Sequence, residues 1–164
     1  MNVRNIEEAD LDSIVAIYYK IENKTPSATL EGWGLSELRE QLSDFLSDKN
    51  YICLCDEVHS KMASFVFCRV ASMHLATIEI FCKNPDLDPR EDDSSLSYCA
   101  YNVEAGHANP VFAALIQELR RRGIQTANTL VNKKHHNFRL HTKFLEFGGF
   151  NKTSEFAEYE MDVL

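Results

Sequence analysis

Residues 51–82 read YICLCDEVHSKMASFVFCRVASMHLATIEIFC, and this stretch decides the fold. It holds three short apolar runs, 51–55, 63–70 and 75–82, whose β-branched and aromatic residues predict strands. The turn-like residues 56–61 join the first two runs into a hairpin. The third run alternates with a period of two, which is typical of an antiparallel strand with two different faces. We expect one face to hold Ala76, Ile78, Ile80 and Cys82 and the other to hold Thr77, Glu79 and Phe81.

Two helices are predicted upstream of this hairpin. Residues 3–6 make a short first strand, and apolar residues then recur at helical spacing from Leu11 to Tyr18 behind acidic capping candidates. The segment 23–34, with one proline and two glycines near its end, interrupts the helical pattern. A second apolar stripe follows, made by Leu35, Leu38, Leu42, Phe45 and Leu46.

The best-specified helix begins at Asn109-Pro110, where the asparagine caps the helix and the proline occupies its first turn. Its apolar stripe reaches Leu119, and three arginines followed by Gly123 end it. Residues 124–131 then predict a strand. Because this strand follows a helix, it suggests a crossover to a parallel neighbour.

The remaining segments complete an α/β (α+β) pattern. Residues 83–95 are acidic and loop-like, and 96–103 are either one more strand or part of an inserted loop or hairpin. Residues 138–147 predict a helix stopped by two glycines, and 157–163 alternate as a half-exposed last strand does. We therefore predict a mixed central sheet with helices on both faces.

The composition fits a single domain over residues 1–164, since 45% hydrophobic residues can supply a full core without metal or disulfide staples. Asp and Glu number 25 against 17 Lys and Arg, which argues against a nucleic-acid partner and favours a cationic small substrate. No apolar run reaches the roughly 20 residues of a membrane span, and the first residues are polar rather than a signal-peptide core. We therefore expect a cytoplasmic protein with no membrane partner.

Five cysteines lie inside apolar stretches, without CxxC spacing, and this odd number predicts buried reduced thiols. The alternative is a metal site made by Cys53, Cys55, Cys68 and Cys82. The histidines offer a second alternative, but His135 and His136 are adjacent and point apart, and His141 does not complete an i, i+4 pair. We expect no bound metal.

The order of the predicted elements, with three local stretches, resembles the GCN5-related N-acetyltransferase family over nearly the whole chain. Residues 3–11 resemble the family's opening, and 51–70 resemble its second and third strands around a turn. Residues 144–150, FLEFGGF, resemble its final helix running into a Gly-Phe pair. The resemblance implies that the fourth and fifth strands splay apart and that the pantetheine arm of acetyl-CoA, or of another acyl-CoA, pairs with the fourth strand.

The resemblance also implies where the cofactor binds. If 75–82 is the fourth strand, its pantetheine contacts are Ile80, Phe81 and Cys82, and the pyrophosphate rests on amides at the start of the helix near Pro110. The preceding loop departs from the family's Gly-x-Gly pattern, because it has one glycine and the proline removes one amide. Alternatively, the strand at 96–103 is itself the cofactor strand. The candidate phosphate contacts are Gly106, His107, Ala108 and Asn109.

Three further residues are candidates by their place in the family pattern. Asn132 and Asn137 follow the fifth strand, where an asparagine of the family contacts the pantetheine amides, and capping of the next helix is the equal alternative. Trp33 lies in the loop where the family closes its acceptor site, and a tethering hydrophobic contact is its alternative role.

Acyl transfer to an amine needs a neutral amine, a placed thioester and a donor to the developing oxyanion, and only the first demands a side chain. Glu79 is the candidate base, because a lone carboxylate in an apolar strand is either partnered or placed to take a proton. The alternative is an exposed carboxylate on the open face of the strand. Leu145 stands where the family often has a tyrosine acid, so Tyr98 or Tyr101 is the candidate substitute.

Two functions follow from these observations. The first is an N-acyltransferase that moves an acetyl or other acyl group from acyl-CoA to a primary amine of a small molecule or peptide. The second is a non-catalytic domain of the same fold that binds a metabolite or a protein partner, including a second copy in a homodimer. Stabilisation by acetyl-CoA separates the two.

Overall fold

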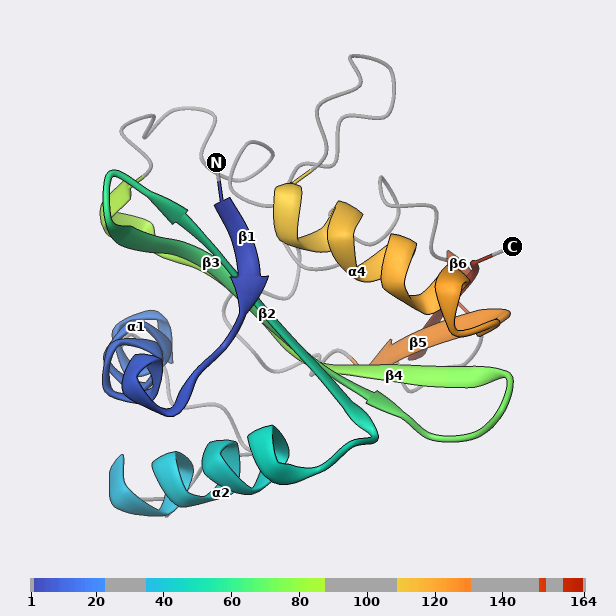
Figure 1. Cartoon of the computed structure of the whole chain (residues 1–164), viewed down its shortest axis with the longest axis horizontal. Helices are drawn as coiled ribbons and strands as arrows, with labels where there is room; N and C mark the ends of the chain where they lie inside the picture. Colours follow the sequence, from blue (N-terminus) through green and yellow to red (C-terminus); the bar gives the residue numbers. More distant parts are fainter. Residues whose placement is uncertain (1, 23–34, 88–108, 131–150, 153–157, 164) are drawn as a thin grey trace.

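The computed structural model describes residues 2–22, 35–87, 109–130, 151–152 and 158–163, which form one seven-stranded sheet in the order β1-β2-β3-β4-β5-β7-β6 (Figure 1). The strands are β1 (Asn2–Asn5), β2 (Tyr51–Val58), β3 (Lys61–Val70), β4 (Leu75–Lys83), β5 (Thr126–Leu130), β6 (Asn151–Lys152) and β7 (Glu158–Asp162). β4 and β5 pair in parallel, and the other neighbours pair antiparallel. The predicted mixed sheet is therefore confirmed.

Helices cover both faces of the sheet, as predicted (Figure 1). The helices α1 (Leu11–Glu22) and α2 (Leu35–Ser47) lie on one face, and α4 (Pro110–Arg121) lies on the other. Side chains that alternate along the strands feed two separate apolar cores, because successive residues of a strand point to opposite faces. The core under α4 includes Leu54, Val66 and Phe112, and the core under α1 and α2 includes Phe65 and Phe67.

Both predicted ends of α4 are confirmed. The side-chain oxygen of Asn109 accepts the main-chain N–H groups of Val111 and Phe112 at 3.0 and 3.2 Å, and Pro110 is the first helical residue. At the other end Gly123 has a φ of 75°, the left-handed conformation in which helices often end. Capping is local chemistry, so it can be read from neighbouring residues.

The turn of the β2–β3 hairpin is shorter than predicted. His59 and Ser60 alone make it, with φ values of 50° and 61°, which is the two-residue turn that suits the twist of paired strands. Residues 56–58 belong to β2 instead, because β1 pairs with Asp56 and Glu57 and β3 pairs with Val58. Asp56 is only 3% exposed and accepts the N–H of Asn2 at 3.1 Å.

Several predicted elements lie outside the described residues: the loop over 23–34, the strand over 96–103 and the helix over 138–147. The short strand β6 was not predicted, whereas β7 fits the predicted last strand, with Met161 half-buried and Val163 buried against the α4 side. In the part of the chain that the structure describes, no helix is both long and apolar enough to cross a membrane.

Candidate functional site

The parallel strands β4 and β5 separate soon after they meet. They pair at three positions, Leu75 with Thr126, Ala76 with Ala127 and Thr77 with Asn128, although β4 continues to residue 83 and β5 to residue 130. These three pairs are the whole of the pairing between the two strands within the described residues.

The side chain of Thr129 makes the hydrogen bond that follows the last paired position of β4 and β5. The Thr129 hydroxyl donates to the Ile78 carbonyl at 2.9 Å, where a continuing parallel ladder would place the N–H of residue 130. Beside it the Thr77 hydroxyl donates to the side-chain oxygen of Asn128 at 2.7 Å. We call the point where the strands part the fork, and define it by Thr77, Ile78, Glu79, Asn128 and Thr129.

A β-bulge at Glu79 changes the direction of β4. In the β3–β4 register Cys68 faces Ile78 and Phe67 faces Ile80, which leaves Glu79 as an extra residue. A bulge bends its strand and increases the local twist, and Glu79 lies two residues beyond the last pair of β4 with β5. The bend in β4 therefore falls close to where the pairing of the two strands ends.

The bulge also overturns the predicted alternation of this strand. Before the bulge, Ala76 and Ile78 share the core under α4, as the predicted alternation requires. Beyond it Phe81 packs against that core, whereas Ile80 and Cys82 pack against the core under α1 and α2. One inserted residue shifts the period-two pattern by one, so the expectation that Ile78 and Ile80 share a face was wrong.

Main-chain atoms of β4 are exposed at the bulge. Glu79 as a whole residue is exposed although its side chain is only 26% exposed, so much of its exposed surface lies on the main chain. Further along, the Asn84 N–H donates to the Ala63 carbonyl at 2.7 Å. The main-chain groups of successive residues in a strand point to opposite neighbours, and those of Asn84 point to β3. Counting back from Asn84, the groups of Cys82 therefore point to β3 and those of Phe81 to the β5 side.

The side chain of Glu79 is partnered. Its two oxygens accept hydrogen bonds from the Tyr51 hydroxyl and from Arg69 Nε, each at 2.9 Å. Tyr51 stacks on Phe45 of α2 with ring centroids 4.2 Å apart. Burial and the bond to Glu79 raise the pKa of Tyr51 above its usual value, so the phenol stays protonated and keeps donating.

The start of α4 carries no spare amide in its first turn. Val111 and Phe112 donate to the Asn109 side chain, the Ala113 N–H donates to the Asn109 carbonyl at 2.9 Å, and Pro110 has no N–H. The amides expected to receive a pyrophosphate therefore have an internal partner. A phosphate that binds here must displace the Asn109 side chain.

The other predicted site residues lie outside the described residues, and their roles stay predictions: Trp33, Tyr98, Tyr101, Gly106, His107, Ala108, Asn132 and Asn137. The histidines His135, His136 and His141 and the position of the missing acid, Leu145, lie outside them as well.

The four described cysteines do not converge on a metal. Cys53, Cys55 and Cys82 lie on the α1 and α2 side of the sheet, whereas Cys68 lies in the core under α4. Burial raises the pKa of Cys53 and of Cys68 to about 12 and that of Cys55 to about 11, so these thiols stay protonated at neutral pH. Among the described residues no three His, Cys, Asp or Glu side chains gather into a possible metal site, and the four-cysteine alternative fails on geometry.

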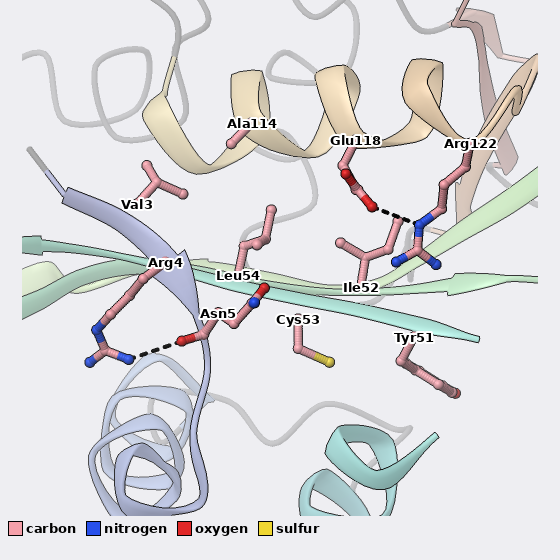
Figure 2. Close-up of a pocket in the computed structure, with 10 residues that line it drawn as sticks. All are labelled: Val3, Arg4, Asn5, Tyr51, Ile52, Cys53, Leu54, Ala114, Glu118 and Arg122. Carbon is pink, nitrogen blue, oxygen red and sulfur yellow. Dashed lines mark hydrogen bonds and ion pairs between the residues drawn. The ribbon is translucent and has the colours of Figure 1, made fainter. Parts of the chain in front are cut away.

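A separate hollow of about 460 Å³ opens where β1 ends beside β2 and α4 passes over them (Figure 2). Glu118 and Arg122 line it and are bonded to each other at 2.8 Å, and Arg121 also binds Glu118. The hydrogen bond from Arg121 and, to a smaller extent, the one from Arg122 lower the pKa of Glu118 to about 2. β3 separates this hollow from the fork, and Tyr51 connects the two, because it lines the hollow and its hydroxyl donates to Glu79 of the fork.

Solved structures share this architecture. The chain aligns over 98% of its length with 98% of the PaiA N-acetyltransferase from Thermoplasma acidophilum in complex with coenzyme A, at a TM-score of 0.66 and 11% identity. It aligns over 99% of its length with 93% of the ribosomal-protein-S18-alanine N-acetyltransferase from Escherichia coli, at a TM-score of 0.66 and 17% identity. It also aligns over 100% of its length with 98% of an aminoglycoside 6'-acetyltransferase type Ii, at a TM-score of 0.69 and 8% identity.

No protein-family model matches the chain, and no curated protein sequence matches it. At these low identities the comparisons show the fold. The chain has the GCN5-related N-acetyltransferase fold, and the fold predicted from the resemblance is confirmed.

Proposed function

We propose that the chain is an N-acyltransferase that moves an acetyl or other acyl group from acyl-CoA to a primary amine. The observation that carries the proposal is the fork, where β4 bends at Glu79 and leaves β5 after three paired positions. Exposed main chain at such a parting can pair with the amide groups of an extended arm as another strand does. The opening lies towards the carboxyl ends of two parallel strands, the place where open α/β sheets bind their ligands.

The proposed roles follow from this placement. The acyl-CoA supplies an activated thioester when bound, and the main chain of Glu79 and of Phe81 holds it in the fork. Glu79 accepts the proton of the attacking amine, since each carboxylate oxygen keeps a lone pair beyond the one that Tyr51 or Arg69 occupies. The main-chain groups of Ile80 and Cys82 face β3, so the pairing predicted for them passes to Glu79 and Phe81, and the contacts predicted for the residues outside the described ranges remain part of this proposal.

A thermal-shift titration with acetyl-CoA tests the function. Binding to the folded state alone stabilises it by about 2.7 kcal/mol when the ligand is at 100 times its Kd, which is a readily measured rise in Tm. Desulfo-CoA, which keeps the pantetheine arm and the phosphates, is the matched ligand control for the thioester. Absence of any stabilisation at millimolar acetyl-CoA would contradict the proposal.

One observation favours a second candidate, a non-catalytic domain of the same fold. The Asn109 side chain satisfies the amides at the start of α4, so the described residues provide no ready phosphate site there. Such a domain binds a metabolite or a protein partner, including a second copy of the chain. An unchanged Tm with CoA, together with a stable dimer in sedimentation velocity, would favour this candidate over the enzyme.

We also propose a cytoplasmic location. The support is chemical: Cys53, Cys55 and Cys68 are free thiols, and a reducing compartment keeps thiols in this form. Fractionation of cells that express the tagged chain tests it, and recovery of the chain outside the cytoplasmic fraction would contradict it.

A further inference from the structure

A row of polar residues crosses the sheet at the level of the fork. The register places Tyr51 of β2 opposite Arg69 of β3, Arg69 opposite Thr77 of β4, and Thr77 opposite Asn128 of β5. Residues directly opposite one another share a face of the sheet. Tyr51 stacks on α2, so the row lies on the face that carries α1 and α2, whereas α4 lies on the opposite face.

Glu79 lies beside this row, and its carboxylate and the guanidinium of Arg69 differ in how many of their hydrogen-bonding groups have partners. Both oxygens of Glu79 accept hydrogen bonds, from Tyr51 and from Arg69. Arg69 has Glu79 as its one partner among the described residues and uses only Nε for it. Its two terminal NH2 groups keep their donors, and 47% of its side chain is exposed.

The carboxylate of Glu79 also fixes the position of the guanidinium. A charge-assisted bond to Nε, together with the cross-strand neighbours Tyr51 and Thr77, restrains a side chain that is otherwise long and mobile. A restrained, planar guanidinium binds a planar anion at a lower entropic cost than a mobile arginine side chain does. Arg69 therefore has the properties of a recognition residue.

We propose that Arg69 selects an acceptor that carries a carboxylate near its amine, such as an amino acid or a short peptide. The inference rests on the proposed function, because it assigns the acceptor side of the fork to the face opposite α4. The terminal NH2 groups of Arg69 receive the carboxylate, and Glu79, bonded to the same side chain, lies where the amine approaches β4. The acidic net charge of the chain favours a cationic acceptor in general, and Arg69 adds a local requirement for an anion.

Kinetics with matched acceptors test the inference. We expect the kcat/KM for glycine or phenylalanine to exceed that for the corresponding amide, glycinamide or phenylalaninamide, by roughly tenfold, the size of one charge-assisted contact. The Arg69→Ala variant should lose this preference mainly through KM, and Arg69→Lys should keep part of it. Arg39→Ala, which removes an exposed guanidinium bound to Glu8 and Asp12, should keep the preference.

A binding measurement makes the inference testable without turnover. The Nε–Hε signal of Arg69 in a ¹H–¹⁵N spectrum of the CoA-saturated chain should shift on addition of N-acetylglycine and stay in place with N-acetylglycinamide. Arg69→Ala should abolish N-acetylglycine binding measured by calorimetry, whereas Arg39→Ala should not.

The outcomes separate the inference from the function on which it rests. Acetyl transfer without any preference for the carboxylate, or a preference that survives Arg69→Ala, overturns the inference and leaves the proposed function intact. Arg69-dependent binding of N-acetylglycine with no acetyl transfer to any amine supports the anion site and counts against the proposed enzyme. No shift at Arg69 with N-acetylglycine overturns the inference whatever the enzyme does.

Discussion

The β2–β3 hairpin and the β4–β5 junction are neighbours in one sheet, yet they are built differently. β2 and β3 are in register at eight positions and bury apolar side chains on both faces. β4 and β5 are in register at three, and polar side chains, Thr77, Asn128 and Thr129, make the last contacts. The hairpin therefore joins the two cores, and the junction is the place where two neighbouring strands stop pairing.

The difference has a physical origin. Burial of apolar surface rewards complete pairing in the hairpin, because each paired residue also adds a side chain to one of two cores. At the junction the bulge at Glu79 bends β4, and the Thr129 hydroxyl satisfies the Ile78 carbonyl that a continuing ladder would have satisfied. The pairing of the two strands therefore ends without leaving this carbonyl unpaired.

Removal of a large side chain from the hairpin should cost the most stability. Phe67 is fully buried, and its ring packs against Phe65 and Phe45 at centroid distances of 6.2 and 6.0 Å. We expect Phe67→Ala to lower the free energy of unfolding by about 3–5 kcal/mol in urea titrations. Met73→Ala, at a side chain that is 81% exposed, should change it by less than about 0.5 kcal/mol. Equal effects of the two substitutions would contradict a core in the hairpin.

At the fork the expected effect falls on activity instead. Glu79→Gln keeps the shape of the side chain and an oxygen for Tyr51, but it removes the proposed base. We expect kcat to fall by about 10²-fold, the lower part of the range for general base catalysis, with little change in the Tm. A kcat within twofold of the unmodified chain would remove Glu79 from the mechanism.

The Thr129 hydroxyl should matter to the fork more than to the rest of the sheet. Thr129→Val leaves the Ile78 carbonyl without this donor, which should lower the free energy of unfolding by about 1 kcal/mol. Thr129→Ser keeps the hydroxyl and should therefore keep the free energy of unfolding that Thr129→Val loses. Hydrogen exchange should accelerate in β4 and β5 and stay unchanged in β2 and β3. Acceleration spread over the whole sheet would show that the two regions are not independent.

Asn109 lies at the helix end nearest to the proposed phosphates, and its removal should help the cofactor. Asn109→Gly frees the Val111 and Phe112 amides, and glycine at a helix cap costs only a few tenths of a kcal/mol. We expect the Kd for acetyl-CoA in calorimetry to fall about fivefold, on the scale of one hydrogen bond. Weaker binding would mean that the asparagine contacts the cofactor itself, as a cofactor-binding role for Asn109 implies.

Acid titration gives the smallest effect, on the face away from the polar row. The bonds from Arg121 and Arg122 hold the pKa of Glu118 at about 2, below its ordinary 4.5. The ionised carboxylate therefore stabilises the folded state above about pH 4.5, and this contribution is lost as the pH falls towards 2. Because the arginines are partly exposed, we expect less than about 1 kcal/mol. Glu118→Gln should flatten the pH dependence of stability in that window, and an unchanged profile would contradict the shift.

The sequence predicted local features of the fold well. The ends of α4 depend on Asn109, Pro110 and Gly123, which act on their own neighbours, and the apolar stripes marked α1 and α2. The position of β4 was also predicted, but its register was not. The bulge at Glu79 depends on how β3 pairs with β4, and the sequence of β4 alone continues its alternation through that residue.

The candidate site was only partly predicted for the same reason. Glu79 was found as an isolated carboxylate, but its partners lie 28 and 10 positions away on two other strands. Tyr51 and Arg69 stand at strand ends with no motif around them. Their signal is the register itself, in which Tyr51, Arg69 and Thr77 face one another, and it becomes visible once the hairpin is paired.

A crystal structure of the chain with CoA tests the fork most directly. We predict density for the pantetheine arm between β4 and β5, starting beyond Thr77 and Asn128 and running along the main chain of Glu79 and Phe81. Density for CoA in the hollow beside β1 and α4, or β4 and β5 hydrogen-bonded along their whole length with CoA absent, would contradict it.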